Sequence, residues 1–577
     1  MAEELVIADL STCQPQECLT RETQRPGTWM LYDYETEEGL RGTMVYGAGR
    51  MESPSLRLPL SGAEGWYKIY VAIWHSIHME GSHLRLKLEQ DRYYRQCGPE
   101  IMGAKDRKQT GPELMLDRDG QPLNYDFGPA DLTESFWRVA ELKEEWLTID
   151  RVRTWGEPTI VNKAADPGAC LAYVRLVPAS LEERDMYAGR GRTQKPKVQF
   201  AQYDNGNWWQ VGCRTEEDIR ASLDWFGGTD LVKVNWGCFS NEGCCYPTQV
   251  GVQMGREPEV TRCIAEFFER GIDPLRVASE YAREIGLELY PSFRIGGKRP
   301  APTLPTTNEM PFFDSHQDCV AMAPDGTPTP HYSFAHDEVR AFFVDVVCEA
   351  ARNYDVPGVH FIFARSNPFV LYEEKVVEEF CQQHGVDPRE LAEDDERWLA
   401  HRASYLTEFV RQLRQGLDKV GERRGTRVEL AVTVPSEPHI VPYWGVDCHT
   451  WAQEGLVDYL ILHAGGVVAI EDLQRHVKVI GDTGVPLVVD FYPRRMPARS
   501  RLLRAVEYYD AGADGFCFWD GQARVNRASE FAWSRFLGHD EDLADWAERL
   551  GTEYRILPMR TLQGYSLDRR FWTLTSG

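Results

Sequence analysis

The pattern of apolar and polar positions changes character once along the chain. Before residue 190, apolar residues alternate with polar ones in the two-residue period of strands, as in Leu56–Leu60, Trp66–Trp74 and Leu84–Leu88. Gly, Pro and Ser separate these runs, long helical patterns are scarce, and Ala172–Val177 forms the last run of the series. The pattern predicts an antiparallel β-sandwich, jelly-roll-like, over residues 1–190, ending in a Gly-rich linker at residues 188–193.

From Lys197 onward, short apolar runs alternate with amphipathic stretches. The predicted strands are Val198–Tyr203, Leu231–Trp236, Leu287–Phe293, Gly358–Phe363, Val428–Val434, Tyr459–His463, Leu487–Phe491 and Gly515–Trp519. The predicted helices between them include Asp273–Glu284, Asp337–Asn353, Arg397–Val420, Ile470–Ile480 and Ser500–Tyr509. Strand candidates that are mostly followed by helices predict an α/β fold, a (β/α)8 TIM barrel over residues 191–545.

A doubly wound open sheet is the competing fold. That fold requires a Gly-rich phosphate loop after an early strand, and the nearest candidate, Arg294-Ile295-Gly296-Gly297, lacks the GxGxxG spacing. The barrel is therefore the preferred prediction. Residues 546–577 are too few for a domain, and we expect them to pack as a C-terminal tail on the body of the protein.

Composition and charge narrow the range of partners. The 577 residues carry a formal net charge of −25, which disfavours contact with nucleic acid or with anionic lipid. No apolar run is long enough to cross a bilayer, so we expect no membrane partner. The start, Met1–Leu5, is acidic and lacks the basic segment of a signal peptide, which predicts a cytoplasmic protein unless a leader has been removed. Homo-oligomer formation is left open.

Polar and aromatic residues gather where the predicted strands end. In a barrel of this type, the chemistry takes place at the carboxyl ends of the strands. The residues predicted to bind substrate there are Asp204, Asn235, Trp236, Arg294, Arg365, His463, Tyr492 and Trp519. Aromatic faces stack on the C–H surfaces of sugars while charged groups bind hydroxyls, so this combination is typical of a site for a polyhydroxylated ligand.

Carboxylates at the same strand ends provide candidates for catalysis. Cleavage of a glycosidic bond needs one acid to protonate the leaving oxygen and a second carboxylate to attack or to activate water. Glu437 follows predicted strand five and Asp490 lies near the end of predicted strand seven, so they can face each other across the mouth. Asp520 and Glu373 are the reserve candidates.

Each of these residues also has an ordinary structural interpretation. An Asp at a strand end often caps a helix, Glu373 stands at the start of a helix where negative charge is favourable, and the arginines can belong to ion pairs. His463 and the aromatic residues can belong to the core. The site hypothesis therefore depends on the whole group of residues rather than on any single one.

The loop Phe312–Asp318 brings Asp314, His316 and Asp318 close together in sequence. This spacing has no defined coordination geometry, and a loop lined by solvent or substrate is the preferred interpretation. The cysteines form neither a CxxC pair nor a Cys/His cluster at zinc spacing. The sequence predicts no metal and no cofactor.

Several segments of the barrel resemble the family-10-like glycosyl hydrolases, glycosidase-like TIM-barrel proteins. They are Gly358–Phe361 through Arg365, the residues Asp387–Leu391, Asp395, Arg397–Leu399, Arg402 and Leu406–Phe409, and the segments Glu454–Tyr459, Tyr492–Met496 and Ala511–Gly515. The resemblance covers roughly residues 197–540 and implies a barrel that acts on or binds carbohydrate. A β-sandwich ahead of such a barrel also fits enzymes of carbohydrate metabolism.

The sequence departs from that family at one position. Many relatives read Gly-hydrophobic-His-Phe-Asp in the fourth strand, and the place of that Asp is taken here by Ile362. Any catalytic duty of the missing carboxylate would pass to Glu437, Asp490, Asp520 or Glu373. The resemblance thus implies sugar binding more firmly than hydrolysis.

The sequence as a whole predicts a glycoside hydrolase-like enzyme. Glu437 is the expected general acid and Asp490 the companion base or nucleophile, with Asp520 as its substitute. One alternative is a carbohydrate-binding barrel without hydrolytic activity, and the other is a sugar-acid lyase or isomerase.

Overall fold

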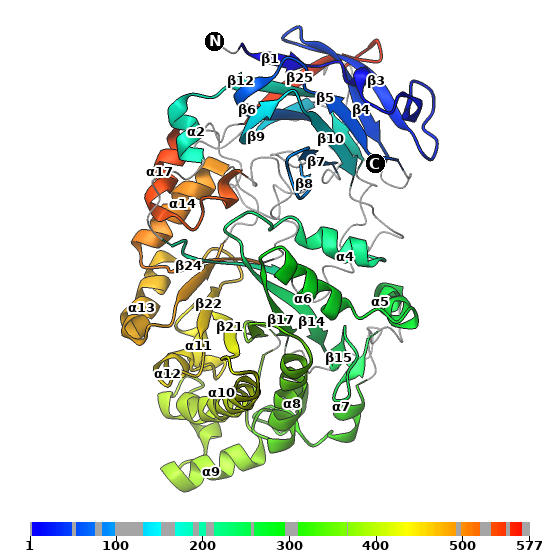
Figure 1. The fold of residues 1–577 in the computed structure, drawn as a ribbon. Helices are drawn as coiled ribbons and strands as arrows, with labels where there is room; N and C mark the ends of the chain where they lie inside the picture. Colours follow the sequence, from blue (N-terminus) through cyan, green and yellow to red (C-terminus); the bar gives the residue numbers. More distant parts are fainter. Residues whose placement is uncertain are drawn as a thin grey trace.

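A computed structural model describes most of the chain. The described residues are 3–48, 53–75, 84–97, 131–151, 168–187, 195–203, 213–254, 259–294, 310–365, 367–491, 498–519, 532–549 and 554–567. Figure 1 shows an N-terminal region of strands above a barrel that is surrounded by helices. The predicted linker and the predicted boundary at residue 190 lie outside the described residues.

The N-terminal region consists of two sheets. The larger sheet has the order β1-β12-β6-β9-β25-β3-β4-β11, with β2 beside β3 and β26 beside β25, and the smaller one has the order β5-β10-β7-β8. All their pairings are antiparallel except that of β2 with β3. The strands of the larger sheet are β1 (Leu5–Ile7), β2 (Leu19–Thr20), β3 (Trp29–Thr36), β4 (Arg41–Gly47), β6 (Glu64–His75), β9 (Asp131–Lys143), β11 (Ala169–Leu171), β12 (Tyr173–Pro178), β25 (Tyr554–Leu562) and β26 (Tyr565–Ser566). Those of the smaller sheet are β5 (Leu56–Pro59), β7 (Leu84–Leu88), β8 (Arg95–Gln96) and β10 (Trp146–Arg151).

The two sheets enclose an apolar core between their facing sides. Leu58 of β5 and Leu86 of β7 belong to the same buried cluster as Val71 of β6 and Trp137 of β9. Since side chains along a strand alternate between its faces, this core explains the two-residue period of these strands. The predicted antiparallel N-terminal sandwich is confirmed.

The end of the chain contributes a strand to this region. β25 pairs with β9 on one side and with β3 on the other, both antiparallel. In Figure 1 its red ribbon lies among the blue strands of the N-terminal region. The sequence analysis treated residues 546–577 as a tail, whereas the structure has β25 as an interior strand of the larger sheet.

Eight parallel strands form the second region and close into a barrel. Their order is β13-β24-β23-β22-β21-β20-β17-β14, and β13 also pairs with β14 to complete the ring. The strands are β13 (Val198–Tyr203), β14 (Lys233–Ser240), β17 (Glu288–Arg294), β20 (Gly358–Ile362), β21 (Glu429–Pro435), β22 (Tyr459–His463), β23 (Leu487–Asp490) and β24 (Gly515–Trp519). The predicted TIM barrel is confirmed, because an open doubly wound sheet would leave two edge strands unpaired.

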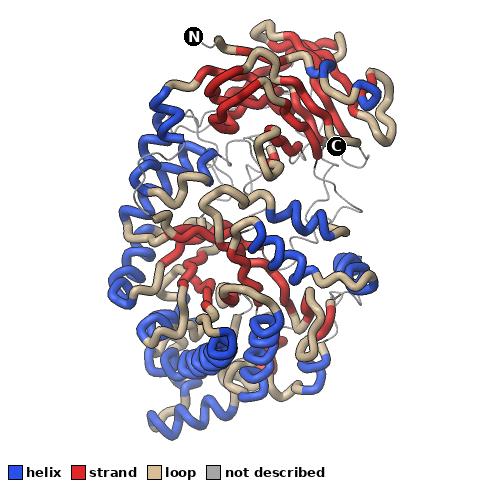
Figure 2. Tube along the Cα trace, in the orientation of Figure 1, coloured by secondary structure: helices blue, strands red, loops and turns tan. Residues whose placement is uncertain are grey.

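Helices cover the outside of the barrel, as Figure 2 shows. The longer ones are α4 (Glu216–Leu223), α5 (Glu259–Glu269), α6 (Pro274–Glu284), α8 (Asp337–Asn353), α9 (Glu374–His384), α10 (Glu396–Arg424), α13 (Ile470–Ile480), α14 (Ala498–Asp510) and α17 (Asp540–Arg549). The shorter ones are α2 (Leu181–Tyr187), α7 (Pro311–Ser315), α11 (Ile440–Tyr443) and α12 (Cys448–Gln453). Local sequence sets their ends: the Asp395 side chain caps the start of α10, and Gly425 ends that helix in the left-handed conformation.

Four short strands lie in the segments that follow β14 and β17. β15 (Gly243–Cys244) and β16 (Val252–Gln253) extend the sheet beside β14, and β18 (Val320–Met322) pairs with β19 (Pro328–Tyr332) in the segment between β17 and α8. These pieces enlarge the carboxyl end of the barrel on the side of β14 and β17.

The two regions share an apolar boundary. The ring of Phe136 in β9 lies 5.8 Å from that of Trp546 in α17, and the ring of Tyr187 in α2 lies 5.6 Å from that of Phe536. Phe136 and Trp546 are both fully buried and belong to the large cluster that surrounds the barrel. This packing joins the sandwich to the helices that follow the last barrel strand.

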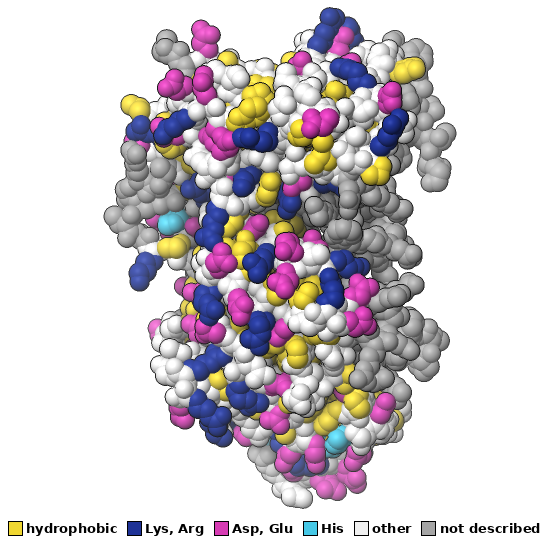
Figure 3. Space-filling view, turned by 45° about the vertical axis from the view of Figure 1, so that its right-hand side comes forward, with side chains coloured by type: hydrophobic (Ala, Val, Ile, Leu, Met, Phe, Trp, Pro, Cys, Tyr) yellow, Lys and Arg dark blue, Asp and Glu magenta, His cyan; other side chains and the backbone are white. Residues whose placement is uncertain are grey.

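Charges of both signs are interspersed on the face drawn in Figure 3. Acidic and basic side chains alternate there over the helices of the barrel, so this face presents no broad basic patch. Among the helices that the structure describes, none has the length and apolarity needed to span a bilayer.

Candidate functional site

The inward faces of the barrel strands carry two layers of different character. The lower layer is apolar and consists of Phe200, Tyr290, Ala431, Ile461, Val488 and Cys517. Side chains two positions further along a strand lie on the same face, nearer its carboxyl end. Those positions carry Gln202, Ser292, Thr433, His463, Asp490 and Trp519, to which β14 adds Asn235 and β20 adds His360. Each of these upper-layer side chains is at most 5% exposed, so the carboxyl end of the barrel holds a buried polar layer.

Asp490 is held by two neighbouring strands. Its Oδ2 lies 2.7 Å from Nδ1 of His463, and its Oδ1 accepts a hydrogen bond of 3.2 Å from the backbone N–H of Trp519. In the neutral form of the ring, the bond to a carboxylate places the proton on Nδ1, and Nε2 then has a lone pair. The His463 ring also packs against the Trp519 ring at a centroid distance of 4.4 Å. The ends of β22, β23 and β24 thus form one connected unit.

Glu437 lies beside this unit. The backbone N–H of Ser436 donates to the carbonyl of His463, which fixes the end of β21 against the end of β22. The Ser436 hydroxyl donates a bond of 3.3 Å to Oε2 of Glu437, whose side chain is half-buried. In the ring of strands, β22 is the only strand between β21 and β23, so His463 stands between the two predicted catalytic carboxylates.

Arg365 reaches the unit from the opposite side of the barrel. It follows β20, which stands four places from β24 in the ring of strands. Its guanidinium carbon nevertheless lies 5.3 Å from the ring centroid of Trp519, a cation–π contact across the carboxyl end of the barrel. Arg294 ends β17 in register with Ile362 and is half-buried at the same end.

Several polar atoms of this layer are buried without a hydrogen-bond partner among the described residues. They are both side-chain amide atoms of Asn235, Nε2 of Gln202, Nε2 of His463 and Nε of Arg365. Gln202 is in register with Asn235 on one side and with Trp519 on the other, so Gln202 and Asn235 come from adjoining strands. Because a buried polar group without a partner costs free energy, such a group in a native fold calls for an explanation, and a polar ligand is one.

His360 completes the polar layer on the far side. Its Nδ1 lies 2.8 Å from the Ser292 hydroxyl, and its Nε2 lies 2.8 Å from the Thr433 hydroxyl. Complete burial lowers the pKa of His360 to about 3, so the ring is neutral. Ile362 follows two positions later on the same inward face, buried at 1% exposure. An apolar side chain therefore occupies this level of β20.

Two predicted site residues, Trp236 and Glu373, lie outside the polar layer. Trp236 follows Asn235 and so faces outward, fully buried in the apolar cluster between the barrel and its helices. Glu373 is 2% exposed and accepts hydrogen bonds from the N–H of Leu371 and from the Ser333 side chain, while burial raises the pKa of its carboxyl. The structure thus places Trp236 in the core and Glu373 as a buried group at the start of α9.

The remaining predicted residues are of two kinds, those that the structure does not describe and those that it places in a loop. Asp204, Tyr492 and Asp520 lie outside the described residues. In the Asp314–Asp318 loop, His316 stacks on the Phe312 ring at 4.1 Å and its Nδ1 donates to the Phe312 carbonyl, so its ring serves the loop itself. Sequence reasoning missed Gln202, whose only signal is a polar residue at an inward position of an apolar strand.

Comparison with known protein families finds a match to most of the barrel. Residues 239–492 match the family model described as Glycosyl hydrolase-like 10. The match confirms the resemblance found in the sequence. The glycosyl hydrolase-like segment contains Arg294, Arg365, Glu437, His463 and Asp490, whereas Asn235 and Trp519 flank it. Among curated proteins, none matches the sequence.

Solved structures with a similar arrangement include three glycosidases. The α-L-fucosidase isoenzyme 2 of Paenibacillus thiaminolyticus is 12% identical with a TM-score of 0.41, over 61% of this chain and 50% of that one. A maltogenic α-amylase of Thermotoga neapolitana is 11% identical with a TM-score of 0.36, over 59% and 75%. The exo-β-N-acetylglucosaminidase of Vibrio harveyi is 11% identical with a TM-score of 0.32, over 58% and 44%. This chain thus spans about half the length of the fucosidase that it matches.

Proposed function

We propose that the protein hydrolyses O-glycosidic bonds of a glycan or glycoside at the carboxyl end of the barrel. Glu437 acts as the general acid, and Asp490 is the companion carboxylate that acts through His463. The family match over residues 239–492 supports the reaction class. The observation that carries the proposal is the buried polar layer in which an Asp–His pair stands next to a glutamate.

The Asp490–His463 pair is suited to activate water. Both oxygens of Asp490 accept hydrogen bonds and the residue is 1% exposed, so its carboxylate is positioned to orient His463 rather than to attack a sugar. Nε2 of His463 is buried without a partner among the described residues. It can take the proton of a water molecule as that water attacks the anomeric carbon, and the Asp490 carboxylate then stabilises the imidazolium.

Glu437 supplies the other half of the reaction. A protonated carboxyl group gives its proton to the glycosidic oxygen while the bond from that oxygen to the anomeric carbon breaks. The water proton goes to His463, and the hydroxyl joins the anomeric carbon from the opposite face. This route inverts the anomeric configuration, and His463 between the two carboxylates provides the separation that a water molecule needs.

The polar layer also offers groups that can bind the sugar. Asn235 provides a donor and an acceptor, Gln202 provides a donor, and the Arg365 guanidinium provides a charged donor. Sugar hydroxyls can pair with each of these atoms, so binding would remove the cost of burying them unpaired.

A carbohydrate-binding barrel without hydrolysis is the second candidate. Ile362 favours it, because this residue points inward at the level where relatives place a carboxylate. Such a barrel would bind a saccharide through the same polar layer and release no reducing end.

The test is a screen of diverse glycans and aryl glycosides with detection of new reducing ends, run on the full chain. For a substrate that is cleaved, Glu437→Gln, Asp490→Asn and His463→Gln each lower kcat roughly 10²- to 10⁴-fold, and the product has inverted configuration. Glu471→Gln, an exposed residue at the start of α13, is the matched control and keeps full activity.

Any different result would contradict a specific part of the proposal. Full turnover in Glu437→Gln and Asp490→Asn rejects the assigned roles, and retained configuration rejects water activation by His463. Saturable saccharide binding without any cleavage favours the second candidate. An unsaturated product would instead indicate a lyase.

A further inference from the structure

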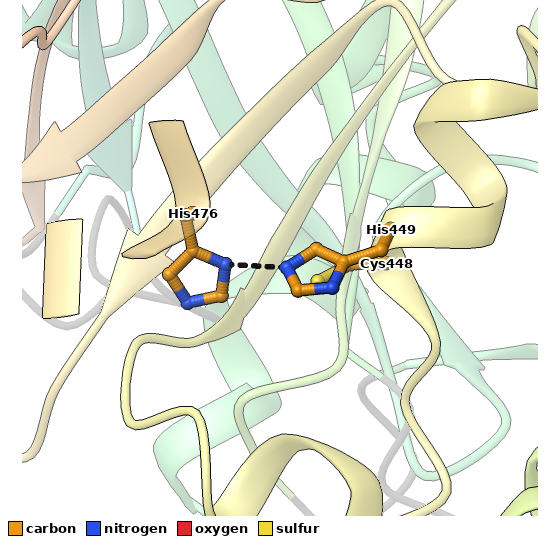
Figure 4. Close-up of side chains that lie close together, drawn as sticks. All are labelled: Cys448, His449 and His476. Atoms are coloured by element: carbon orange, nitrogen blue, oxygen red, sulfur yellow. Dashed lines mark hydrogen bonds between the residues drawn. The ribbon is translucent and has the colours of Figure 1, made fainter. Parts of the chain in front are cut away.

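Three side chains with metal-binding atoms meet beside the end of β21. Cys448 and His449 start α12, and His476 lies in α13 (Figure 4). One ligand atom from each residue lies within 4.8 Å of the other two, and Nε2 of His449 is 3.0 Å from Nδ1 of His476. None of these residues belongs to the proposed sugar site.

The orientation of His476 is fixed by the backbone. Its Nε2 lies 2.8 Å from the carbonyl oxygen of Ser436, and a carbonyl can only accept, so Nε2 carries the proton. Nδ1 therefore has a lone pair, and this lone pair accepts the hydrogen bond from Nε2 of His449. Histidines that bind metals are held in this way, with the second ring nitrogen donating to a carbonyl or a carboxylate.

The two histidines are in the protonation state that metal binding needs. Burial lowers the pKa of His449 and of His476, so both rings are in the neutral form that binds metals. The nearby carboxylates act against this lowering, because Asp447 raises the pKa of His449 and Asp472 raises that of His476. The thiol itself is protonated in this structure, because burial raises the pKa of Cys448 to about 12.

We propose that Cys448, His449 and His476 bind one divalent transition-metal ion, with Zn²⁺ as the best chemical match. Sγ of Cys448, Nε2 of His449 and Nδ1 of His476 are the ligands, and the fourth tetrahedral position is open. One thiolate with two imidazoles is a ligand set typical of zinc. Metal–nitrogen bonds of about 2.0–2.1 Å and a metal–sulfur bond of about 2.3 Å place tetrahedral ligand atoms roughly 3.3–3.6 Å apart. The two nitrogens, now 3.0 Å apart, would separate slightly, and the sulfur already lies within 4.8 Å of both.

Binding moves protons in a defined way. Cys448 releases its thiol proton to solvent, and the proton on Nε2 of His449 is replaced by one on Nδ1 of the same ring. One proton is thus released per metal ion bound. His449 is only half-buried, which gives the ion an approach from the surface.

The bound ion would cross-link α12 to α13 behind the proposed acid. His476 donates to the Ser436 carbonyl, and Ser436 precedes Glu437 and donates to its carboxylate. The metal therefore has a structural role beside the mouth of the barrel and takes no part in the proposed hydrolysis.

A second group, Cys319, His336 and Glu338, also brings three ligand atoms within 4.8 Å of one another. Its Glu338 is exposed, and Nε2 of His336 has no hydrogen-bond partner among the described residues that would fix the ring. This group is therefore the natural comparison in the test.

The test is titration of the full chain, stripped with a chelator, with Co²⁺ and then with Zn²⁺. We expect one Co²⁺ per chain with a thiolate charge-transfer band and the visible bands of tetrahedral cobalt, displacement by Zn²⁺, and release of about one proton per ion. Cys448→Ser abolishes the thiolate band, and His476→Gln weakens binding at least tenfold.

Two control variants distinguish this site from other thiols. Cys319→Ser removes the thiol of the second group, and Cys13→Ser removes a thiol of the sandwich whose pKa burial also raises to about 12. Both keep the thiolate band if the proposal is correct. His449→Gln, at a half-buried position, tests the site should Cys448→Ser fail to fold.

No saturable Co²⁺ binding, or a thiolate band that survives Cys448→Ser and is lost in Cys319→Ser, overturns the proposal. Since the proposed steps of hydrolysis use Glu437, Asp490 and His463 and none of the three metal ligands, either result leaves the proposed function unaffected.

Discussion

At the scale of single residues, the buried amide of Asn235 is expected to lower stability and to serve the binding of a saccharide. The side chain is fully buried, and neither amide atom has a partner among the described residues. Replacing such a group with an apolar one of similar shape is neutral or stabilising, because the burial cost disappears. A saccharide that forms hydrogen bonds with this amide in the wild type would lose them in such a variant.

We therefore predict that Asn235→Leu leaves the free energy of unfolding unchanged or raises it by up to about 2 kcal/mol, while KM rises roughly tenfold. Chemical denaturation and steady-state kinetics measure the two effects. Gln199→Leu is the control, because the amide nitrogen of Gln199 already donates to the Tyr509 hydroxyl at 2.8 Å. That variant should lose stability and keep its KM; a destabilised Asn235→Leu with normal KM would contradict the assignment.

His360 makes stability depend on pH. Its pKa is lowered to about 3 in the folded protein, while an unfolded histidine titrates near 6.5. Between these values the unfolded state binds one more proton, so this contribution to stability is complete above about pH 6.5 and is lost as the pH falls. From pH 6.5 to pH 5 the loss amounts to about 2 kcal/mol.

Urea unfolding of wild type and His360→Gln at pH 7, 6 and 5 measures this contribution. The wild type should lose about 2 kcal/mol more than the variant over this range, because only the wild type must keep a buried imidazole neutral. Parallel losses in the two proteins would show that His360 titrates normally in the folded state.

At the scale of elements, the barrel strands were predictable and β25 was not. A parallel strand buried on both faces is a continuous apolar run, and each such run in the second region coincides with a barrel strand. β25 pairs with strands more than four hundred residues earlier, and a local pattern carries no information about that pairing.

Because β25 is an interior strand, we predict that substitutions at two of its positions differ strongly in their cost to the free energy of unfolding. Leu557 is 1% exposed in the cluster with Tyr34 and Met44, so Leu557→Ala should cost about 2–5 kcal/mol of unfolding free energy. Arg555→Ala removes only an ion pair with Glu38 in which both partners are more than half exposed, and should cost at most about 1 kcal/mol. Thermal and urea denaturation compare them; equal costs would mean that β25 is not an interior strand.

The candidate site shows a similar division between what sequence predicts and what it does not. Strand ends identified Asp490, His463, Glu437 and Arg365 because the carboxyl ends of barrel strands meet at one mouth. Which face a residue takes depends on the register of the strand, so Trp236 was expected at the mouth and lies in the core. The meeting of Cys448 with His476 depends on how two helices pack, and no spacing in the sequence shows it.

At the scale of the whole molecule, the sandwich and the barrel share one apolar boundary. Phe136 of β9 and Trp546 of α17 are fully buried against each other, and Arg95 of β8 donates to the carbonyl of Asp224 in the barrel at 2.8 Å. The chain also returns to the sandwich after the barrel. Unfolding of either region would therefore expose apolar surface of the other.

We predict a single thermal unfolding transition, and Trp546→Ala should lower its midpoint by several degrees without splitting it. Calorimetry, together with tryptophan fluorescence and far-ultraviolet circular dichroism, provides the measurement. Two separated transitions in the wild type would show that the regions unfold independently.

The measurement that tests the central claim most directly is a crystal structure of Glu437→Gln with a saccharide that the wild type cleaves. We predict that the glycosidic oxygen lies within hydrogen-bonding distance of the side chain at position 437, and that a water molecule or the sugar contacts Nε2 of His463, with Asn235 or Arg365 bonded to a hydroxyl. A saccharide bound elsewhere on the protein, with these side chains untouched, would contradict the account.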